Sequence, residues 1–315
     1  MSNKITIIGA GSVGAAIAND LVITDLATEV VLVDINHQKA FGEALDIYQG
    51  LSFGSPAIVR AGDYEDAAGS SIVIITSGLP RKPGQTRLDL AQANINILKQ
   101  ITPNIVKHAP DAIYIIVSNP VDLMTYVFHK TSGIPANRII GSGTVLDTAR
   151  LQAALAKTFH INPRNVHAHV YGEHGDSSFV PWSQALIASN HISKFKEHAP
   201  EGDKIDFNFD YDAWEEAVRT AGAVVIKSKG FTNYAVASSV CHIVRCINNG
   251  SGTAITLSTM MEGEYGVDDV CLSVLCLVDG EGIRGKVIVD LTDEEQAKLQ
   301  ASANKLKETL AAIEW

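Results

Sequence analysis

The first half of the chain alternates short apolar runs with longer stretches of helical periodicity. The apolar runs are rich in β-branched residues and end at turn residues, as buried strands do. They cover Ile5–Gly9, Val30–Asp34, Ala57–Ala61, Ile72–Thr76, Ile113–Ser118 and Arg138–Gly141. Helical periodicity occupies Leu88–Lys107 and Val121–Lys130. Continuous apolar strands that alternate with helices predict an α/β fold, built on a doubly wound parallel sheet covered on both faces.

After residue 142 the pattern changes to a mixture of helices and strands. Helices are expected at Val145–His160, Tyr211–Lys227 and Phe231–Ile247, and from about Thr292 to the end. Strands are expected at Val166–Tyr171, Thr253–Met261, Val270–Val278 and Lys286–Val289. The chain therefore divides into a nucleotide-binding domain at 1–142 and an α+β catalytic domain at 143–315. Because pockets favour interfaces between domains, a site is expected where the two halves meet.

Residues 9–14 read GAGSVG, a glycine-rich motif placed between the first strand and a helix. Gly9 permits a tight turn, Gly11 lets a pyrophosphate approach the backbone, and Gly14 allows close helix–strand packing, with Val13 between them. The helix N-terminus offers unpaired N–H groups to the phosphate. Asp34 ends the second strand 20 residues after Gly14. A carboxylate there accepts bonds from a ribose and repels a 2′-phosphate, so a Rossmann domain that binds NAD is favoured over a solvated strand-end acid.

Polar residues also follow the fourth and fifth strands, at the sheet edge where such folds bind ligands. Thr76 and Gly78 end the fourth strand, and Val117 and Asn119 end the fifth. These four residues are candidates for cofactor binding. Asn119 precedes a proline, so it is either a turn residue or an amide that positions a substrate hydroxyl or the nicotinamide.

The segment LPRKPGQTR, residues 79–87, combines two prolines, a glycine and three cations. One interpretation is a solvated basic loop. The other is a lid that brings Arg81 and Arg87 over an anionic substrate and excludes water when it closes.

The second half supplies a candidate acid–base group. Asp147 and Arg150 are three apart on the expected helix and share one face, as a surface ion pair also would. His174 lies between Gly172 and Gly175, where the backbone has the freedom to turn a ring into a cleft. An NAD site with a histidine, an aspartate and several arginines is the set that hydride transfer to a 2-oxo acid requires.

Charge and composition narrow the possible partners. The 35 acidic residues outnumber the 25 basic ones and give a net charge of -10. No basic face for nucleic acid or anionic lipid is evident, and no apolar stretch approaches the ~20 residues of a membrane span. A cytoplasmic protein is therefore expected. The spacing of the four cysteines favours buried reduced thiols over zinc or disulfides, so no metal is expected. They are Cys241, Cys246, Cys271 and Cys276.

Five motifs occur in one order along the chain. They are GAGSVG (9–14), VSNPVD (117–122), GSGTVLDTAR (141–150), GEHGDSS (172–178) and KGFTNYA (229–235). In this order and approximate spacing the chain resembles the NAD-dependent L-lactate/L-malate dehydrogenase family over essentially its whole length, and overall its bacterial lactate-type members. An NAD-dependent glycosidase would need a metal-binding Cys/His pair near the nicotinamide, and a non-catalytic protein would not need the four candidate catalytic residues together.

The resemblance implies a role for each polar candidate. His174 is the proton donor and acceptor, and Asp147 orients it. Arg150 holds the substrate carboxylate, Arg87 polarises the carbonyl from the lid, and Asn119 helps to hold the reacting oxygen. A planar guanidinium suits the role of Arg150 because it binds a carboxylate with two parallel hydrogen bonds.

One position divides the family on substrate. At Arg81, six residues before the lid arginine, lactate-type members often carry Gln and malate-type members Arg. GEHGDSS, Thr232 (which would line the substrate side-chain pocket) and the C-terminal half resemble lactate-type members. L-lactate dehydrogenase, which reduces pyruvate with NADH, is thus favoured, and L-malate dehydrogenase, which reduces oxaloacetate, is the alternative that Arg81 supports.

The resemblance also bears on regulation and assembly. Bacterial members activated by fructose 1,6-bisphosphate tend to carry an arginine at the position of Gln152, opposite a histidine that corresponds to His167. The histidine is present and the arginine is absent, which puts this activation in doubt. Members of the family are dimers or tetramers, so a homotetramer or homodimer is expected.

Overall fold

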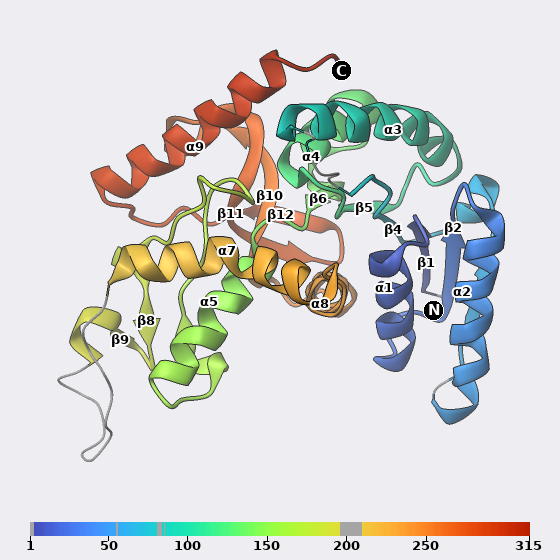
Figure 1. The fold of residues 1–315 in the computed structure, drawn as a ribbon, viewed down its shortest axis with the longest axis horizontal. Coiled ribbons are helices and arrows are strands. Elements are labelled where there is room, and N and C mark those ends of the chain that lie inside the picture. The colour runs from blue at the N-terminus through green and yellow to red at the C-terminus, as the bar shows by residue number, and fades with distance from the viewer. Residues whose placement is uncertain (1–2, 55, 81–83, 85, 196–209) are drawn as a thin grey trace.

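A computed structural model of the chain describes residues 3–54, 56–80, 84, 86–195 and 210–315 (Figure 1). Its first six strands form a parallel sheet in the order β3-β2-β1-β4-β5-β6. These strands are β1 Lys4–Ile8, β2 Glu29–Val33, β3 Ile58–Ala61, β4 Ile72–Ile75, β5 Ile113–Ile116 and β6 Ile139–Gly141. The doubly wound parallel sheet predicted from the sequence is confirmed.

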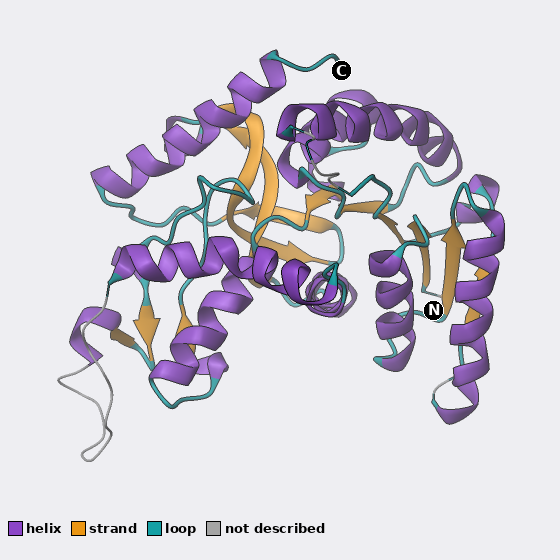
Figure 2. Ribbon diagram, in the orientation of Figure 1, coloured by secondary structure: helices purple, strands orange, loops and turns teal. Residues whose placement is uncertain are grey.

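Helices cover the strands on both faces (Figure 2). They are α1 Ser12–Ile23, α2 His37–Gly50, α3 Arg87–His108, α4 Val121–Ser132, α5 Val145–Thr158, α7 Tyr211–Lys229, α8 Tyr234–Asn249 and α9 Asp293–Ala311. Short 3₁₀ segments lie at Leu51–Phe53, Tyr64–Ala67, Ala136–Arg138, Pro163–Asn165, Trp182–Gln184, Ile192–Lys194 and Glu264–Gly266. Every residue of β4 and β5 is buried, which explains why these strands read as uninterrupted apolar runs.

The start of α3 is fixed by the sequence, and it places Arg87. The Thr86 hydroxyl accepts the backbone N–H of Asp89 at 3.1 Å, and the Asp89 carboxylate accepts the backbone N–H of Thr86 at 3.2 Å. This reciprocal capping box satisfies two N–H groups that the first helical turn leaves unpaired. Arg87 is therefore the first residue of the helix, at the end of the loop that joins it to β4.

The second half continues the same sheet. The antiparallel strands β10 Thr253–Glu262, β11 Asp268–Asp279 and β12 Gly282–Lys286 extend it to nine strands, with Ser258 of β10 paired to Gly141 of β6. A Cβ on Gly141 would lie 2.7 Å from the Ser258 Cβ, so glycine permits this junction. A large hydrophobic core runs through both halves, and a second cluster of buried residues lies within the second half. The division into domains at 142/143 stays a prediction.

Two predicted strands differ from the structure. Only Val166–His167 of the run to Tyr171 forms a strand, β7, which joins β8 Leu186–Ile187 and β9 Asn190–His191 in a small separate sheet. Beyond it the chain leaves that sheet, and Gly172 exchanges backbone hydrogen bonds with Ser273 of β11. β12 ends at Lys286, where the predicted strand begins, because a tight hairpin after Asp279 pairs the chain at once. No helix among the described residues is long and apolar enough to cross a membrane.

Candidate active site

A cavity of about 690 Å³ lies along the carboxyl ends of β1, β2 and β4. Gly9 has a φ of +110°, and a Cβ there would lie 2.7 Å from the Thr76 hydroxyl oxygen. A Cβ on Gly14 would overlap the Gly9 carbonyl oxygen, whereas one on Gly11 would meet no atom within 4 Å. Gly11 is the N-cap of α1, and no side chain caps that helix end. The turn is thus closed on the protein side and open toward the cavity, as a phosphate site requires.

Asp34 is held at the wall of this cavity by two backbone groups. Its Oδ2 accepts the N–H of Ala10 at 2.7 Å, and its Oδ1 accepts the N–H of Asn36 at 2.8 Å. Because a carboxylate oxygen can accept more than one hydrogen bond, both oxygens of Asp34 can also bind ribose hydroxyls. A fixed carboxylate beside an open helix N-terminus fits NAD.

The other predicted cofactor residues surround the same strand ends. Thr76 and Gly78 line the cavity, and the Thr76 hydroxyl donates to the Gly9 carbonyl at 2.9 Å. Val117 is buried at the end of β5. Val13 packs against the core from α1 and does not line this cavity, so a side-chain role in binding finds no support.

A second cavity, of about 450 Å³, collects the predicted substrate and catalytic residues from separate elements of the chain. Its lining includes Arg87, Asn119, Asp147, Arg150, His174 and Thr232. α3, α5 and the loops before α4, after β7 and before α8 supply them. Arg81 lies outside the described residues.

His174, Asp147 and Arg150 form one chain of contacts in this cavity. The Asp147 Oδ2 lies 2.5 Å from His174 Nδ1, and the Asp147 Oδ1 accepts from Arg150 Nη1 at 3.0 Å. The charge of Asp147 raises the pKa of His174 to about 9, against the opposing effect of burial. Burial alone would raise the pKa of Asp147, but His174 and Arg150 outweigh it and lower that pKa. The arrangement keeps the carboxylate charged and the imidazole protonated at neutral pH.

Arg87 lies at the rim of the cavity. Its guanidinium donates to Asp176 Oδ1 at 3.0 Å, and both side chains are more than half exposed, at 62% and 60%. An exposed ion pair of this kind contributes little to stability. Arg87 is therefore free, at small cost, to exchange Asp176 for a substrate group.

Three charged residues near this site were not predicted from the sequence. Arg219 and Lys305 line the cavity from α7 and α9. Asp122, on α4, is 3% exposed and accepts the backbone N–H of His174 at 2.8 Å. Its position at the end of the VSNPVD motif was the one available signal, whereas Arg219 and Lys305 carry no motif that distinguishes them from solvent-facing helix residues.

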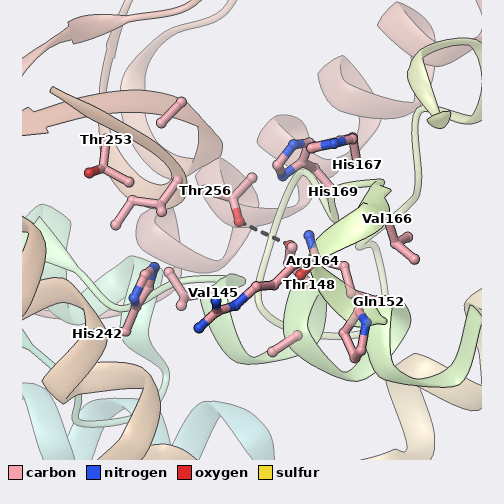
Figure 3. A pocket seen from close by; sticks show the side chains of 14 residues that line it. Val145, Thr148, Gln152, Arg164, Val166, His167, His169, His242, Thr253 and Thr256 are labelled. Carbon is pink, nitrogen blue, oxygen red and sulfur yellow. Dashed lines mark hydrogen bonds between the residues drawn. The ribbon is translucent and has the colours of Figure 1, made fainter. Parts of the chain in front are cut away.

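A third cavity, of about 310 Å³, contains the two positions that bear on bisphosphate activation (Figure 3). Gln152 and His167 both line it, with Arg164, His169 and His242. The Gln152 amide donates to the Ala168 carbonyl at 3.2 Å, so it braces the backbone. Burial lowers the pKa of His169 to about 4, which keeps that ring neutral.

Comparisons with known proteins identify the family. Residues 3–141 match the family profile described as lactate/malate dehydrogenase, NAD binding domain, and residues 144–314 match the corresponding α/β C-terminal domain. L-lactate dehydrogenase 1 of Clostridium acetobutylicum is 44% identical over 312 residues, which cover 99% of each chain. L-lactate dehydrogenase of Clostridium botulinum (strain Hall) is 46% identical over 311 residues, which cover 98% of this chain and 96% of that protein.

Solved structures agree with this assignment. The minor L-lactate dehydrogenase from Enterococcus mundtii, in a ligands-bound form, superposes with a TM-score of 0.93 at 35% identity and 99% coverage of both chains. A lactate dehydrogenase from a Medee basin deep-sea metagenome library gives 0.93 at 36% identity, with 99% coverage of both. The chain thus belongs to the lactate/malate dehydrogenase family and carries that family's NAD-binding domain.

Proposed function

We propose that this protein is an L-lactate dehydrogenase, which reduces pyruvate to L-lactate with NADH and catalyses the reverse reaction. The observation that carries the proposal is the contact chain from Arg150 through Asp147 to His174 in one cavity. These contacts support a role for Arg150 in binding the substrate carboxylate and for the protonated His174 as the acid. The relatives named above are L-lactate dehydrogenases, which supports the same substrate for this chain.

Each residue has a defined task in the proposed reaction. NADH, when bound, supplies the hydride that reduces the carbonyl carbon. Asp147 occupies His174 Nδ1, which leaves Nε2 as the nitrogen that gives its proton to the carbonyl oxygen. Once the Arg87 guanidinium has exchanged Asp176 for the substrate, it stabilises negative charge on that carbonyl oxygen. Asn119 contributes an amide donor from the end of β5.

The substrate carboxylate belongs at Arg150. Asp147 occupies Nη1 of this guanidinium, so Nη2 and Nε remain as donors for a carboxylate. Gly222 of α7 faces the same guanidinium. A Cβ at this position would be in van der Waals contact with it, 3.5 Å from Arg150 Nη2. Glycine leaves the space beside the guanidinium to the substrate.

The cations of the cavity favour pyruvate over oxaloacetate. Besides the protonated His174, four arginine and lysine side chains line it among the described residues: Arg87, Arg150, Arg219 and Lys305. Arg219 is 3.3 Å from a carboxylate oxygen of Glu215, and Lys305 is 3.7 Å from one of Glu173. To reach a cation among these described residues, a second substrate carboxylate would have to displace one of these pairs, whereas the methyl group of pyruvate needs no cation.

His174→Ala tests the proposed acid directly. Pyruvate reduction should fall by ~10²–10⁴-fold, the range that general acid–base catalysis supplies. NADH affinity, measured by nicotinamide fluorescence, should hold because Gly11 and Asp34 line a separate cavity. His108→Ala, at the far end of α3 from Arg87, is the matched control. A His174→Ala enzyme that keeps more than half of the wild-type kcat would contradict the assignment.

We also propose that the protein is a homodimer or homotetramer. Phe41, Leu45 and Tyr48 form an apolar stripe on α2, and each is at least 41% exposed. Phe53, just beyond the helix, is 94% exposed. Apolar stripes of this extent on a folded protein mark association sites. Light scattering should give at least twice the monomer mass, and Leu45→Glu should reduce it.

The cysteines bear on the compartment. All four are free and buried. Unpaired thiols are typical of reducing compartments, which supports the proposed cytoplasmic location. No group of three or more His, Cys, Asp or Glu within the described part of the chain is placed to hold a metal ion.

A further inference from the structure

Asp122 connects three elements behind the proposed acid. It is the second residue of α4 and is 3% exposed. One carboxylate oxygen accepts the backbone N–H of His174 at 2.8 Å, and the other accepts the hydroxyl of Ser258, on β10, at 2.6 Å. The side chain therefore ties the loop that carries His174 to the central sheet.

The charge of Asp122 has few partners. Within the described residues it forms no ion pair with Lys or Arg, and its place in the first turn of α4 gives it the positive end of the helix dipole. The other ionisable groups that act on it are His174 and Glu173, the latter paired with Lys305. The charge of Asp122 also acts on Cys271 of β11. Burial, however, raises the pKa of that thiol well above its usual value and keeps the thiol neutral.

We propose that Asp122 is a positioning residue for His174, which anchors the backbone of the acid to β10 and places a second negative charge behind the imidazolium. The inference rests on the proposed function only in taking His174 as the acid. Asp147 sets the direction of the ring through Nδ1, and Asp122 sets the position of the backbone that carries it. The two carboxylates thus contact different atoms of His174, the backbone nitrogen and Nδ1.

The charge and the anchor are separable by substitution. Asp122→Asn keeps a carbonyl oxygen for the His174 N–H and an amide group for the Ser258 hydroxyl, but it removes the charge. Ser258→Ala keeps the charge and removes one of its two hydrogen bonds. Glu295→Gln is the matched control, because Glu295 is also buried and also accepts a backbone N–H and a hydroxyl, both from Ser183, without contacting His174.

Asp122 should be visible in the titration of His174. Burial raises the pKa of Asp122 to about 6, although its hydrogen bonds to Ser258 and His174 lower it. The charge of Asp147 raises the pKa of His174 to about 9. The His174 ring should therefore show a main inflection near the higher value and a small second one near the lower value, as the neighbouring carboxylate gains its proton.

The test is a titration of ¹³C-labelled histidine rings by NMR in the complex with NADH, with His174 assigned through the signal lost in His174→Gln. Asp122→Asn should lower the main inflection by roughly 0.5–1.5 pH units, as loss of a nearby opposite charge does. It should also abolish the small inflection. Ser258→Ala should move the small inflection to higher pH, because the carboxylate loses a donor, and Glu295→Gln should change neither.

An unshifted main inflection in Asp122→Asn, or an equal shift in Glu295→Gln, would overturn the inference. Ser258→Ala provides an independent test should Asp122→Asn not fold: a small inflection that stays in place would also refute it. The readout does not require turnover. A wild type that fails to reduce pyruvate would therefore refute the proposed function and leave this test intact.

Discussion

The contact between Asp147 and His174 predicts how the pH profile responds when its charge is removed. Asp147→Asn keeps the size of the side chain and its contact with Arg150, but it takes away the largest cause of the raised pKa of His174. Burial of the ring, which lowers its pKa, then remains with less opposition. The pKa of His174 should fall from about 9 to its ordinary value of 6.5 or below.

The magnitude follows from the fraction of protonated imidazole. At pH 7.5, a group with a pKa of 9 is about 97% protonated, and one with a pKa of 6.5 is about 9% protonated. Pyruvate reduction requires the protonated ring, so kcat/KM at this pH should fall by at least about tenfold from protonation alone. This part of the loss should shrink as the pH falls and disappear well below the pKa of the variant ring, where both enzymes carry the proton. A further loss that is independent of pH is expected because the carboxamide no longer fixes the tautomer.

The assay is kcat/KM for pyruvate as a function of pH, with NADH saturating. The wild-type profile should decline through about pH 9 and the variant profile at least two units lower. Asp176→Asn is the control, since it removes a carboxylate of the same cavity that contacts Arg87 instead of His174. If the midpoint of Asp147→Asn stayed within half a unit of the wild type, the electrostatic explanation would be wrong.

Three further substitutions or additions test the account at other points. Asp34→Ser should narrow the preference in kcat/KM for NADH over NADPH, because the carboxylate that repels a 2′-phosphate is gone; a wild type that prefers NADPH would contradict this. Fructose 1,6-bisphosphate at sub-millimolar concentration should change the KM for pyruvate less than about twofold, since Gln152 offers a neutral amide where a fixed cation is needed. Arg81→Gln should reduce oxaloacetate turnover at least about tenfold, as truncation of a buried charge pair costs ~2–5 kcal/mol, while pyruvate turnover holds or rises. An unchanged oxaloacetate/pyruvate ratio would mean that Arg81 does not face the substrate.

The parts of the fold that sequence predicts best are those fixed by local pattern. The buried strands β4 and β5 are continuous β-branched runs, and GAGSVG marks the turn into α1 by its glycines alone. Pairings between segments far apart in the sequence were harder to predict. The predicted strand stops at His167, and the chain beyond it instead forms backbone hydrogen bonds between Gly172 and Ser273. No local sequence pattern predicts these bonds.

The candidate site shows the same division. His174, Asp147 and Arg150 were predicted as a group, and the structure places them in contact. The contact of Asp122 with the backbone of His174 depends on a fold that brings residues 52 positions apart together. The pairing of Arg87 with Asp176 was likewise not predictable, because it joins the start of α3 to the loop after β7, and these meet only in the folded chain.

The preferred 2-oxo acid decides whether this enzyme is an L-lactate dehydrogenase, as proposed, or an L-malate dehydrogenase. The most direct measurement is kcat/KM for pyruvate and for oxaloacetate, determined side by side with NADH at neutral pH. Pyruvate should be the better substrate, because the further cations that line the cavity in the described structure, Arg219 and Lys305, are already paired. A higher kcat/KM for oxaloacetate would contradict this prediction and assign the enzyme to malate.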